Sequence, residues 1–544
     1  MDKKAIGRAL ERIADLLEVK GENPFKVRAF ANAARLVPSL PDFDERLAAG
    51  TLTGVRGIGE SLAGVVAALA SDAGHPLLDE LKAAFPPGLP DLLGVPGLGP
   101  KKVKLLFDEL KIGSLGELRY AIYENRLVDL PGFGPKTQEK LRVQLERMER
   151  TRGCLLLDEA VEAAAEILRK SPGLLEAGGL RRRLPVVEIL EFLAAPMATP
   201  ERIEQALGWK FSKDGVILSA VHPGTGTPVR VHLPSGRMAV DHFFLTGSAA
   251  HVEQVRALGP LPENAPTEEA LYAAVGLPWI PPQMREGIGE VELARTGRLG
   301  EVVSWEDLCG CFHNHTVASD GASTLEEMRA AAKARQWRFL GIADHSRSAR
   351  YARGLEPERL IEQGRAIRVL NAADPGFRLL HGVESDIHPD GTLDYPDAIL
   401  AELDYVVGSI HSHFNLKREA QNARLLRALA HPSLKILGHP TGRLLLGRDG
   451  CDLDMEAVLE AAAEHGKAVE LNANPHRLDL DWSLLPRAQA LGVTIVINPD
   501  AHSAAHLDDM RWGLLMAGKG LLLKKDCLNC RPPEAIEEFF GGKR

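Results

Sequence analysis

The sequence predicts a multidomain protein with an α-helical N-terminal region, an α+β middle and a C-terminal barrel of parallel strands alternating with helices. Three observations support this prediction. A glycine motif recurs three times between helical patterns before residue 150, mixed strands and helices follow to residue 300, and buried strand-like runs then alternate with amphipathic helices. A chain of 544 residues fits three or four domains. We expect domains or subdomains at 1–80, 81–150, 151–300 and 305–544.

Composition and charge narrow the class of protein. Hydrophobic residues make up 45% of the chain, yet no apolar run approaches the roughly 18 residues that span a bilayer. The N-terminus lacks the apolar core of a signal peptide, so we expect a cytoplasmic protein without a membrane partner. The net charge is −9, so any contact with DNA must depend on local geometry.

Six cysteines, at positions 154, 309, 311, 451, 527 and 530, form no repeated metal-binding framework. Intracellular thiols stay reduced, so disulfides are not expected. Cys527 and Cys530 form a single CxxC pair whose role stays open.

The N-terminal region contains an internal repeat. Residues 3–19 and 27–36 read as helices, and three Gly-x-Gly motifs then each precede a helical pattern. The paired glycines are Gly57 and Gly59, Gly97 and Gly99, and Gly132 and Gly134. Glycine lets the backbone approach a ligand closely, and amides at the following helix N-terminus point at an anion. Nearby basic residues are Lys101, Lys102, Lys104, Lys136, Lys140 and Arg142, each of which can also belong to an ordinary solvated helix face.

These repeats resemble the helix-hairpin-helix motif. The resemblance implies binding of DNA through its phosphates without base reading, with a monovalent cation held by backbone carbonyls. Such contacts make binding dependent on salt and indifferent to sequence. The predicted DNA-binding residues are the six glycines with Lys101, Lys102 and Lys136.

The C-terminal half carries His and acidic residues at the ends of its apolar runs. The runs cover residues 339–343, 379–383, 405–410, 434–437, 468–471 and 494–497, with a shorter run before the first histidines. Seven strands alternating with helices predict a closed or nearly closed barrel with its chemistry at the C-terminal strand ends. The candidate ligands are His313, His315, Asp320, His345, Glu384, His411, His439, Asp500 and His502. One such histidine is usually structural, but nine imidazoles and carboxylates without a thiolate suit Zn, Mn or Fe beside water.

These residues resemble the PHP (polymerase and histidinol phosphatase) family over residues 305–505. The resemblance implies a distorted (β/α)7 barrel and three divalent metal ions held by all nine residues, with His313, Glu384, His411 and Asp500 as catalytic residues. A bridging water of lowered pKa would then attack phosphorus. Residues expected to orient imidazoles or contact substrate are Asp344, Asp386, His413, Arg443, Asn472, Asn474 and Arg477.

The middle of the chain contains a Gly-Gly-Leu-Arg-Arg-Arg stretch at 178–183 and apolar runs at 186–193 and 228–233. In this order, between the repeats and the PHP region, nearly the whole chain resembles a bacterial family X DNA polymerase. The resemblance implies a palm with a serine in its phosphate-binding turn and three aspartates holding two magnesium ions. Those positions are occupied here by Gly179, Ile189, Glu191 and His232, respectively.

Magnesium requires oxygen ligands in near-octahedral geometry, and these residues leave one carboxylate. The thumb after Ser248 also reads as shortened. We therefore expect the palm to be a folded spacer without nucleotidyl transfer, whose Arg181, Arg182 and Arg183 can still contact phosphates.

The function expected by resemblance is a metal-dependent 3′–5′ exonuclease or phosphoesterase of DNA repair, acting on gapped, nicked or 3′-ended DNA. Abasic-site incision and removal of 3′ phosphates are related possibilities, and manganese is the favoured assay metal. Three alternatives remain open: a working gap-filling, template-dependent polymerase with exonuclease activity, a noncatalytic DNA-binding scaffold, and a phosphatase of small molecules. The oligomeric state is not predicted.

Overall fold

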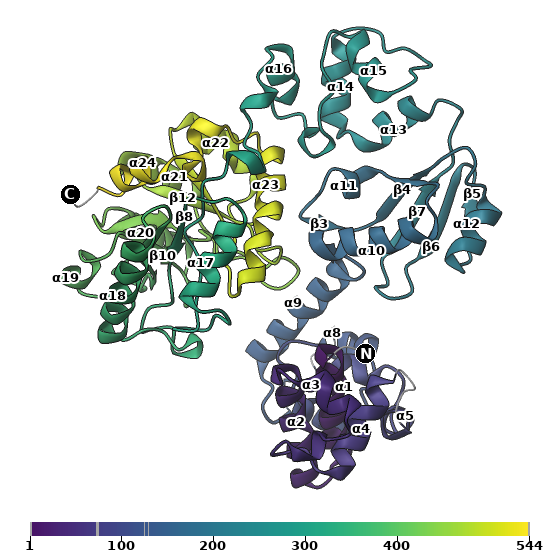
Figure 1. Ribbon diagram of the computed structural model, residues 1–544. Coiled ribbons are helices and arrows are strands. Elements are labelled where there is room, and N and C mark those ends of the chain that lie inside the picture. The colour runs from purple at the N-terminus through teal and green to yellow at the C-terminus, as the bar shows by residue number, and fades with distance from the viewer. Residues whose placement is uncertain (1–2, 72–75, 124–125, 129, 542–544) are drawn as a thin grey trace. The chain divides into compact units, whose positions relative to one another are not determined.

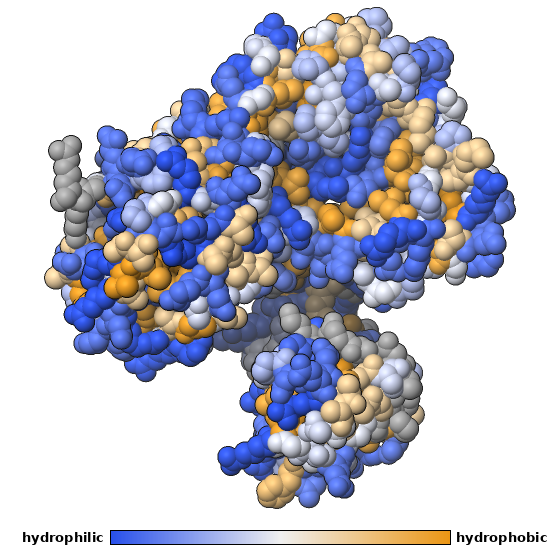
Figure 2. Space-filling model, viewed as in Figure 1, coloured by the Kyte–Doolittle hydropathy of each residue, from blue (hydrophilic) through white to orange (hydrophobic). Residues whose placement is uncertain are grey.

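The computed structural model describes residues 3–71, 76–123, 126–128 and 130–541, and it forms two compact units, 1–152 and 153–544. The four domain ranges given above stay predictions. Figure 2 shows that hydrophilic and hydrophobic residues are mixed on the visible face. No helix of the described ranges is both long and apolar enough to cross a membrane.

The N-terminal unit is entirely helical in its described part, as predicted. Its helices are α1 (Lys3–Lys20), α2 (Pro24–Ser39), α3 (Phe43–Ala48), α4 (Glu60–Ala70), α5 (Pro76–Ala83), α6 (Leu89–Leu92), α7 (Pro100–Leu110), α8 (Leu115–Tyr123) and α9 (Pro135–Thr151). Helix α1 is central, because its buried Leu10, Ile13 and Leu17 belong to a core that extends to Leu145 in α9. This core fixes the helices that follow each glycine motif.

The second unit begins with an α+β subdomain. Its strands are β1 (Leu155–Leu156), β2 (Leu174–Glu176), β3 (Val186–Val187), β4 (Leu190–Ala194), β5 (Ser212–Asp214), β6 (Ile217–Val221) and β7 (Pro228–His232), and its helices are α10 (Leu157–Lys170), α11 (Gly178–Arg181) and α12 (Pro200–Leu207). Five strands form one sheet in the order β2-β4-β7-β6-β5, and β1 pairs with β3. The parallel pair β4 and β7 places Glu191 opposite Arg230 and Leu193 opposite His232. The adjacent ends of these strands therefore bring two of the predicted palm positions together.

A small helical subdomain joins this sheet to the barrel. It contains α13 (Met238–Thr246), α14 (Ala249–Ala257), α15 (Glu268–Ala274) and α16 (Glu290–Arg295). Its core is partly polar: the buried His251 ring contacts Glu290 through Nδ1 (2.7 Å) and the Tyr272 hydroxyl through Nε2 (2.8 Å). Buried polar groups that are fully hydrogen-bonded in this way hold one arrangement of the helices.

The C-terminal part is a curled parallel sheet in the order β13-β12-β11-β10-β9-β8, with helices outside it (Figure 1). The strands are β8 (Phe339–Ile342), β9 (Arg378–Asp386), β10 (Tyr405–Ser409), β11 (Leu434–Leu437), β12 (Ala468–Asn472) and β13 (Thr494–Asn498). The helices are α17 (Leu325–Ala334), α18 (Pro357–Ala373), α19 (Asp397–Leu400), α20 (Arg418–Leu429), α21 (Met455–Glu464), α22 (Leu485–Ala490), α23 (Met510–Lys519) and α24 (Pro533–Phe539). Six of the seven predicted strands and the predicted helices between them are confirmed.

The seventh predicted strand, before His313, is not a regular strand. Residues 309–315 instead lie between the two edges of the sheet. The Gly341 amide donates to the Cys311 carbonyl on the β8 side (2.8 Å), and the His315 amide donates to the Ala501 carbonyl beyond β13 (2.8 Å). The side chains of Asn498 and Asn529 bind the Phe312 amide and the Gly310 carbonyl, respectively. Side-chain amides thus replace ladder hydrogen bonds, which closes the sheet without a seventh strand.

Aromatic side chains fill the interior of the barrel. The rings of Phe312, Phe339, Tyr405 and Phe540 pack together, and the Tyr405 hydroxyl donates to the Phe312 carbonyl (2.5 Å). A Cβ atom on Gly382 would lie 2.4 Å from the Tyr405 ring, so this strand position must be glycine. The filled interior leaves chemistry to the strand ends, as in other closed parallel barrels.

Candidate functional site

All nine predicted ligand residues meet at the C-terminal ends of the barrel strands. The structure contains four overlapping groups in which their ligand atoms lie within 4.8 Å of one another. The members are His313, His315, Asp320, His345, Glu384, His411, His439, Asp500 and His502. Seven of these side chains are nearly buried, whereas those of Asp320 and His502 are 30% and 33% exposed. The cluster therefore opens to solvent on the side of Asp320 and His502.

Glu384, in β9, is at the centre of the cluster. Its Oε1 atom lies 3.0 Å from Nε2 of His411, 3.0 Å from Nε2 of His439 and 3.3 Å from Nε2 of His313. Its Oε2 atom lies 2.8 Å from Nδ1 of His345. One carboxylate therefore faces four imidazoles at the centre of the cluster.

Two further carboxylates extend the cluster. Asp500 Oδ1 lies 3.1 Å from His315 Nε2 and 3.6 Å from His313 Nε2. Asp320 Oδ2 lies 3.3 Å from His502 Nε2 and 3.6 Å from His345 Nε2. Each carboxylate therefore lies among a different set of imidazoles, and neighbouring sets share a histidine.

The donor atoms fit divalent cations. Buried atoms without a well-aligned hydrogen bond include His313 Nε2, His315 Nδ1, His345 Nδ1, His439 Nδ1 and Glu384 Oε2, although His345 Nδ1 and Glu384 Oε2 lie 2.8 Å apart. Buried polar groups are almost always hydrogen-bonded, and neutral imidazole nitrogen is the commonest protein metal ligand. Together with the PHP domain match reported below, the groups indicate divalent-metal binding.

Burial and neighbouring charges shift the pKa values of the clustered residues. Burial alone would lower the pKa of His345, but Glu384 beside it raises that pKa to about 10. Glu384 also raises the pKa of the buried His411 to about 9. Burial opposes ionisation of Glu384 itself, yet His411, His313 and His345 hold its pKa well below the ordinary range. Cations that bind here must displace protons from imidazoles.

A further buried carboxylate, Glu470 of β12, supports the cluster and was missed in the sequence. It is fully buried, and its Oε1 atom lies 2.8 Å from His313 Nδ1. Its Oε2 atom accepts the backbone N–H of His439 at 2.6 Å. Carboxylates that bind the second nitrogen of a ligand imidazole fix its tautomer. The sequence feature that could have identified Glu470 is its position as an acidic residue inside an otherwise apolar strand.

Two of the predicted supporting acids have different partners. Asp386 lies 2.6 Å from Nδ1 of His411, as an orienting residue should. Asp344 accepts hydrogen bonds from the Thr316 amide (2.7 Å) and from the side chains of Ser319 and Gln363, and among its described hydrogen bonds none involves an imidazole. Asp344 therefore shapes the loop between His315 and Asp320 instead of fixing a tautomer.

Arg477 and Asn472 are brought to the cluster. Arg477 Nε lies 3.5 Å from Asp500 Oδ2, and Asn472 Nδ2 donates to the same oxygen at 3.3 Å. Arg443 is instead bound to Asp481 (2.7 Å) and to nearby backbone carbonyls.

His413 and Asn474 have local roles in the structure. The exposed His413 has a φ of +56°, and its carbonyl accepts a hydrogen bond from Gln421. Asn474 closes a turn by accepting the His476 amide (3.0 Å). The described contacts therefore give neither side chain a place in the ligand cluster.

The three N-terminal motifs share one local geometry. In each motif, a backbone amide donates a hydrogen bond of 2.9–3.0 Å to the carbonyl three residues earlier. The pairs are Ile58 to Val55, Leu98 to Val95, and Phe133 to Leu130. The first glycine of each motif has a positive φ: +103° at Gly57, +91° at Gly97 and +80° at Gly132. The second glycines, Gly59, Gly99 and Gly134, accept the first hydrogen bonds of α4, α7 and α9. Each motif is thus a glycine turn leading into a helix N-terminus, a geometry that favours anions.

The basic residues near these turns differ in whether another group of the protein already binds them. Lys101 and Lys136 are exposed, and no ion pair engages them within the described chain. Lys102 donates to the Gly97 carbonyl (3.1 Å), so it stabilises the second turn. Lys104 and Arg142 are paired with acidic residues of their own helices. Lys101 and Lys136 are therefore the cations best placed to meet an external anion.

The predicted palm positions form an ion-paired cluster. Glu191 lies 3.3 Å from both Arg230 and His232, and burial is outweighed by these partners, which lower its pKa. Gly178 lies directly beneath Glu191, because a Cβ atom there would overlap its Oε2. Gly179 lies in α11, and Ile189 lies between β3 and β4. Glu191 and His232, which stand at two of the family's aspartate positions, thus contact each other, and Glu191 also contacts Arg230.

In the described structure Arg181, Arg182 and Arg183 are all paired with carboxylates of the protein, and their contact with phosphates stays a prediction. Arg181 forms a bidentate pair with Glu268 of α15, at 2.7 and 2.8 Å. Arg182 binds Glu286 (3.0 Å), and Arg183 binds Glu176 (2.7 Å). Carboxylates that the sequence pattern did not reveal as partners neutralise all three guanidinium groups.

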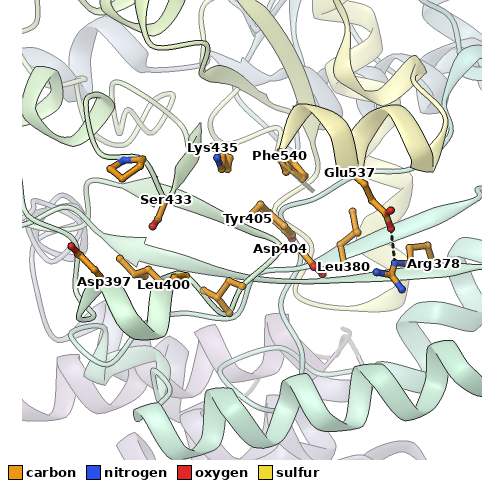
Figure 3. Close-up of a pocket in the computed structure, with 14 residues that line it drawn as sticks. Arg378, Leu380, Asp397, Leu400, Asp404, Tyr405, Ser433, Lys435, Glu537 and Phe540 are labelled. Carbon is orange, nitrogen blue, oxygen red and sulfur yellow. Dashed lines mark ion pairs between the residues drawn. The ribbon is translucent and has the colours of Figure 1, made fainter. Parts of the chain in front are cut away.

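A separate cavity of about 380 Å³ lies at the other end of the barrel strands (Figure 3). It is lined by the first residues of β9 and β10, Arg378 and Tyr405, and by Lys435 and Phe540. Arg378 is paired there with Glu537 (3.1 Å). None of the nine clustered residues lines this cavity.

Comparison with known proteins agrees with these features. Residues 1–71 match a helix-hairpin-helix domain, residues 89–147 a SAM-like helix-hairpin-helix tandem, and residues 312–474 a PHP domain. The chain is 36% identical to the DNA polymerase/3′-5′ exonuclease PolX of Bacillus subtilis, over 99% of both chains. It is 30% identical to a probable phosphatase of Caldanaerobacter subterraneus, over 35% of this chain and 74% of that protein. A Leishmania infantum polymerase beta structure matches 36% of this chain and 96% of that chain at 16% identity, with a TM-score of 0.22.

Proposed function

Because the chain belongs to the family X DNA polymerases that carry a PHP domain, we propose that it is a DNA-repair enzyme that hydrolyses phosphodiesters at DNA 3′ ends. The reaction takes place at the nine-residue cluster, and the bound cations are three divalent ions, with manganese, zinc or iron as the candidate metals. The observation that carries this proposal is the convergence of nine buried or half-buried ligands with unpaired nitrogen atoms.

Cations bound here would lower the pKa of water and neutralise charge on a phosphate. The protein's own residues prepare the site in three ways. Glu470 and Asp386 orient His313 and His411 by binding their Nδ1 atoms, which leaves Nε2 directed at Glu384. Arg477, 18% exposed beside Asp500, is placed to bind a phosphate oxygen. The exposed edge formed by Asp320 and His502 leaves an entry for the DNA end.

We assign DNA binding without base reading to the N-terminal unit. The three glycine turns direct helix N-termini outward, and their first glycines have almost no atoms within 4 Å of a Cβ position. A phosphate can therefore approach the backbone amides closely. Carbonyls of the same turns are candidates to hold a monovalent cation. Gapped, nicked and 3′-ended duplexes are the proposed substrates.

The second candidate function is template-dependent gap filling, which the name of the Bacillus relative favours. The palm argues against it. Glu191 is the one carboxylate among the three aspartate positions, and Arg230 and His232 already surround it. A two-metal transfer site needs several oxygen ligands. We therefore propose that the palm joins the other parts and does not transfer nucleotides.

One experiment separates these functions. End-labelled gapped DNA is incubated with and without manganese and nucleotides, using the wild type, His313→Ala and, as a surface control, Glu464→Gln. We expect metal-dependent shortening from the 3′ end by the wild type and the control but not by His313→Ala. Template-dependent extension by His313→Ala would establish the polymerase instead. DNA binding without either reaction, in protein shown to contain metal, would favour the scaffold.

A further inference from the structure

An exposed tyrosine stands beside the cluster. The Tyr351 side chain is 74% exposed, yet its ring centroid lies 6.1 Å from the ring of His345, one of the nine clustered residues. Exposed aromatic residues are often incidental when isolated, so the position beside the cluster is what makes this one informative. The sequence pattern gave no indication of this placement.

The loop that carries Tyr351 is held in place. Residues 346–355 return on themselves, because the Leu355 amide donates to the His345 carbonyl (2.8 Å) and the Gly354 amide to the Ala349 carbonyl (3.1 Å). Asp394 binds the Ser348 amide at 2.7 Å. Ala349 and Ala352 are buried and anchor the loop. Tyr351 is therefore presented to solvent by a fixed loop.

The same loop is basic. Arg347, Arg350 and Arg353 are exposed on either side of Tyr351. Arg347 lies 3.4 Å from Asp394. Neither Arg350 nor Arg353 has a side-chain hydrogen bond or ion pair to any other described residue. An aromatic face next to unpaired arginines has the composition of a single-stranded nucleic-acid contact.

We propose that Tyr351 stacks on the base of the 3′-terminal nucleotide and that Arg350 and Arg353 attract the strand. This inference rests on the proposed function. A nucleotide whose phosphate lies among the nine residues can place its base near the His345 side of the cluster, where the Tyr351 ring is free. A base that is paired and stacked within a duplex does not offer its face. Stacking on Tyr351 therefore requires that the terminal base be unpaired.

The test compares two oligonucleotides that differ only at the 3′-terminal nucleotide. One ends in thymidine, and the other ends in a tetrahydrofuran analogue that has the sugar and phosphate but no base. Initial rates are measured in manganese at substrate concentrations below KM. Base–aromatic stacking is worth roughly 1–3 kcal/mol, so we expect the wild type to prefer thymidine by at least about fivefold. Tyr351→Ala should abolish this preference while keeping the wild-type rate on the tetrahydrofuran end.

Two variants provide controls. Tyr351→Phe retains an aromatic face and should keep the preference. Tyr120→Ala removes another exposed tyrosine, 58% exposed in α8 of the N-terminal unit, and should leave the ratio of the two rates unchanged. Metal content and unfolding temperature of Tyr351→Ala should equal those of the wild type. A duplex with a mismatched 3′ terminus should likewise lose its advantage over a matched duplex in Tyr351→Ala.

The outcomes distinguish this inference from the proposed function. Equal rates of the wild type on the two ends, or an unchanged preference in Tyr351→Ala, would overturn the role of Tyr351 while hydrolysis of DNA stands. Failure of the metal-loaded wild type to shorten either end would overturn the proposed function and this inference with it.

Discussion

The buried Glu470 offers a sharp test of the cluster, through the substitution Glu470→Gln. Its carboxylate lies within hydrogen-bonding distance of four nitrogen atoms: the His439 amide at 2.6 Å, His313 Nδ1 at 2.8 Å, Asn498 Nδ2 at 2.9 Å and Asn472 Nδ2 at 3.2 Å. A glutamine amide has one acceptor oxygen and one donor group. If the glutamine oxygen still accepts the hydrogen bond from the His439 amide, its NH2 group must face His313 and Asn498.

The consequence falls on a ligand nitrogen. An NH2 group that faces Nδ1 of His313 donates a hydrogen bond to it, so this nitrogen cannot carry the proton of the neutral ring. The proton must then be on Nε2, the atom directed at Glu384 and Asp500. A protonated Nε2 cannot bind a cation. Loss of such an orienting group typically lowers metal affinity 10- to 100-fold, or about 1.4–2.7 kcal/mol. We expect a loss in this range for Glu470→Gln.

The measurement is a manganese titration of metal-free protein by calorimetry, with hydrolysis of 3′-labelled DNA measured in parallel. Glu464→Gln, an exposed carboxylate at the end of α21, is the matched control and should resemble the wild type. DNA affinity without metal should not change in either variant. Metal affinity and hydrolysis by Glu470→Gln within twofold of the wild type would refute the reasoning about the tautomer of His313.

Three further predictions concern other parts of the chain. Gly97→Val together with Gly132→Val should weaken DNA binding at least tenfold by fluorescence anisotropy, because both positions have a positive φ that valine rarely adopts and a side chain would block the phosphate. Glu268→Ala should lower the free energy of unfolding of the second unit by about 3–5 kcal/mol in denaturant titrations, because it leaves buried arginine unpaired. Manganese binding at pH 7.5 should release at least one proton, measured by calorimetry in buffers of different ionisation enthalpy, because carboxylates raise the pKa of His345 to about 10 and of His411 to about 9.

Each prediction has a control. Gly116→Val lies in α8 away from the turns and should not change DNA affinity, so an equal loss in both variants would indicate general destabilisation. Glu269→Ala removes an exposed neighbour of Glu268 and should have little effect on unfolding. For the metal, a heat of binding independent of the buffer would show that the imidazoles are already neutral.

The Glu268 prediction includes a dependence on pH. Burial alone would raise the pKa of Glu268, but hydrogen bonds from Arg181 and Arg285 hold it well below the ordinary value of 4.5. The unfolded state then binds more protons than the folded state at low pH, so stability rises with pH. The contribution is complete above the ordinary pKa and is lost as the pH falls below it. Glu268→Ala should remove this part of the acid sensitivity.

The ligand cluster was predictable because parallel strands end at one edge. Most of the ligands follow an apolar run, so the runs together with the PHP resemblance placed distant residues such as His313 and Asp500 in one site. Glu470 was missed because it is inside such a run, where the pattern treats every residue as core. The irregular closure by residues 309–315 was also not predictable, because it depends on the side chains of Asn498 and Asn529 acting in place of backbone partners.

The same limit explains the arginines of the middle region. Their sequence position suggested free cations, but their partners lie far away in the chain: Glu268 for Arg181 and Glu286 for Arg182, separated by 87 and 104 residues, respectively. A local pattern cannot indicate pairs between residues that lie so far apart in the chain.

These pairs connect the subdomains of the second unit. Glu286 binds Arg182, which directly follows α11 (3.0 Å), and the fully buried Lys519 of α23 (2.5 Å), so one carboxylate connects the sheet subdomain, the helical subdomain and the barrel. Burial lowers the pKa of Lys519 to about 8 although Glu286 opposes the shift. Removing any member would leave a buried charge without its partner, at a cost of several kcal/mol. Arg181 and Arg182 therefore link the sheet subdomain to the helical subdomain through Glu268 and Glu286.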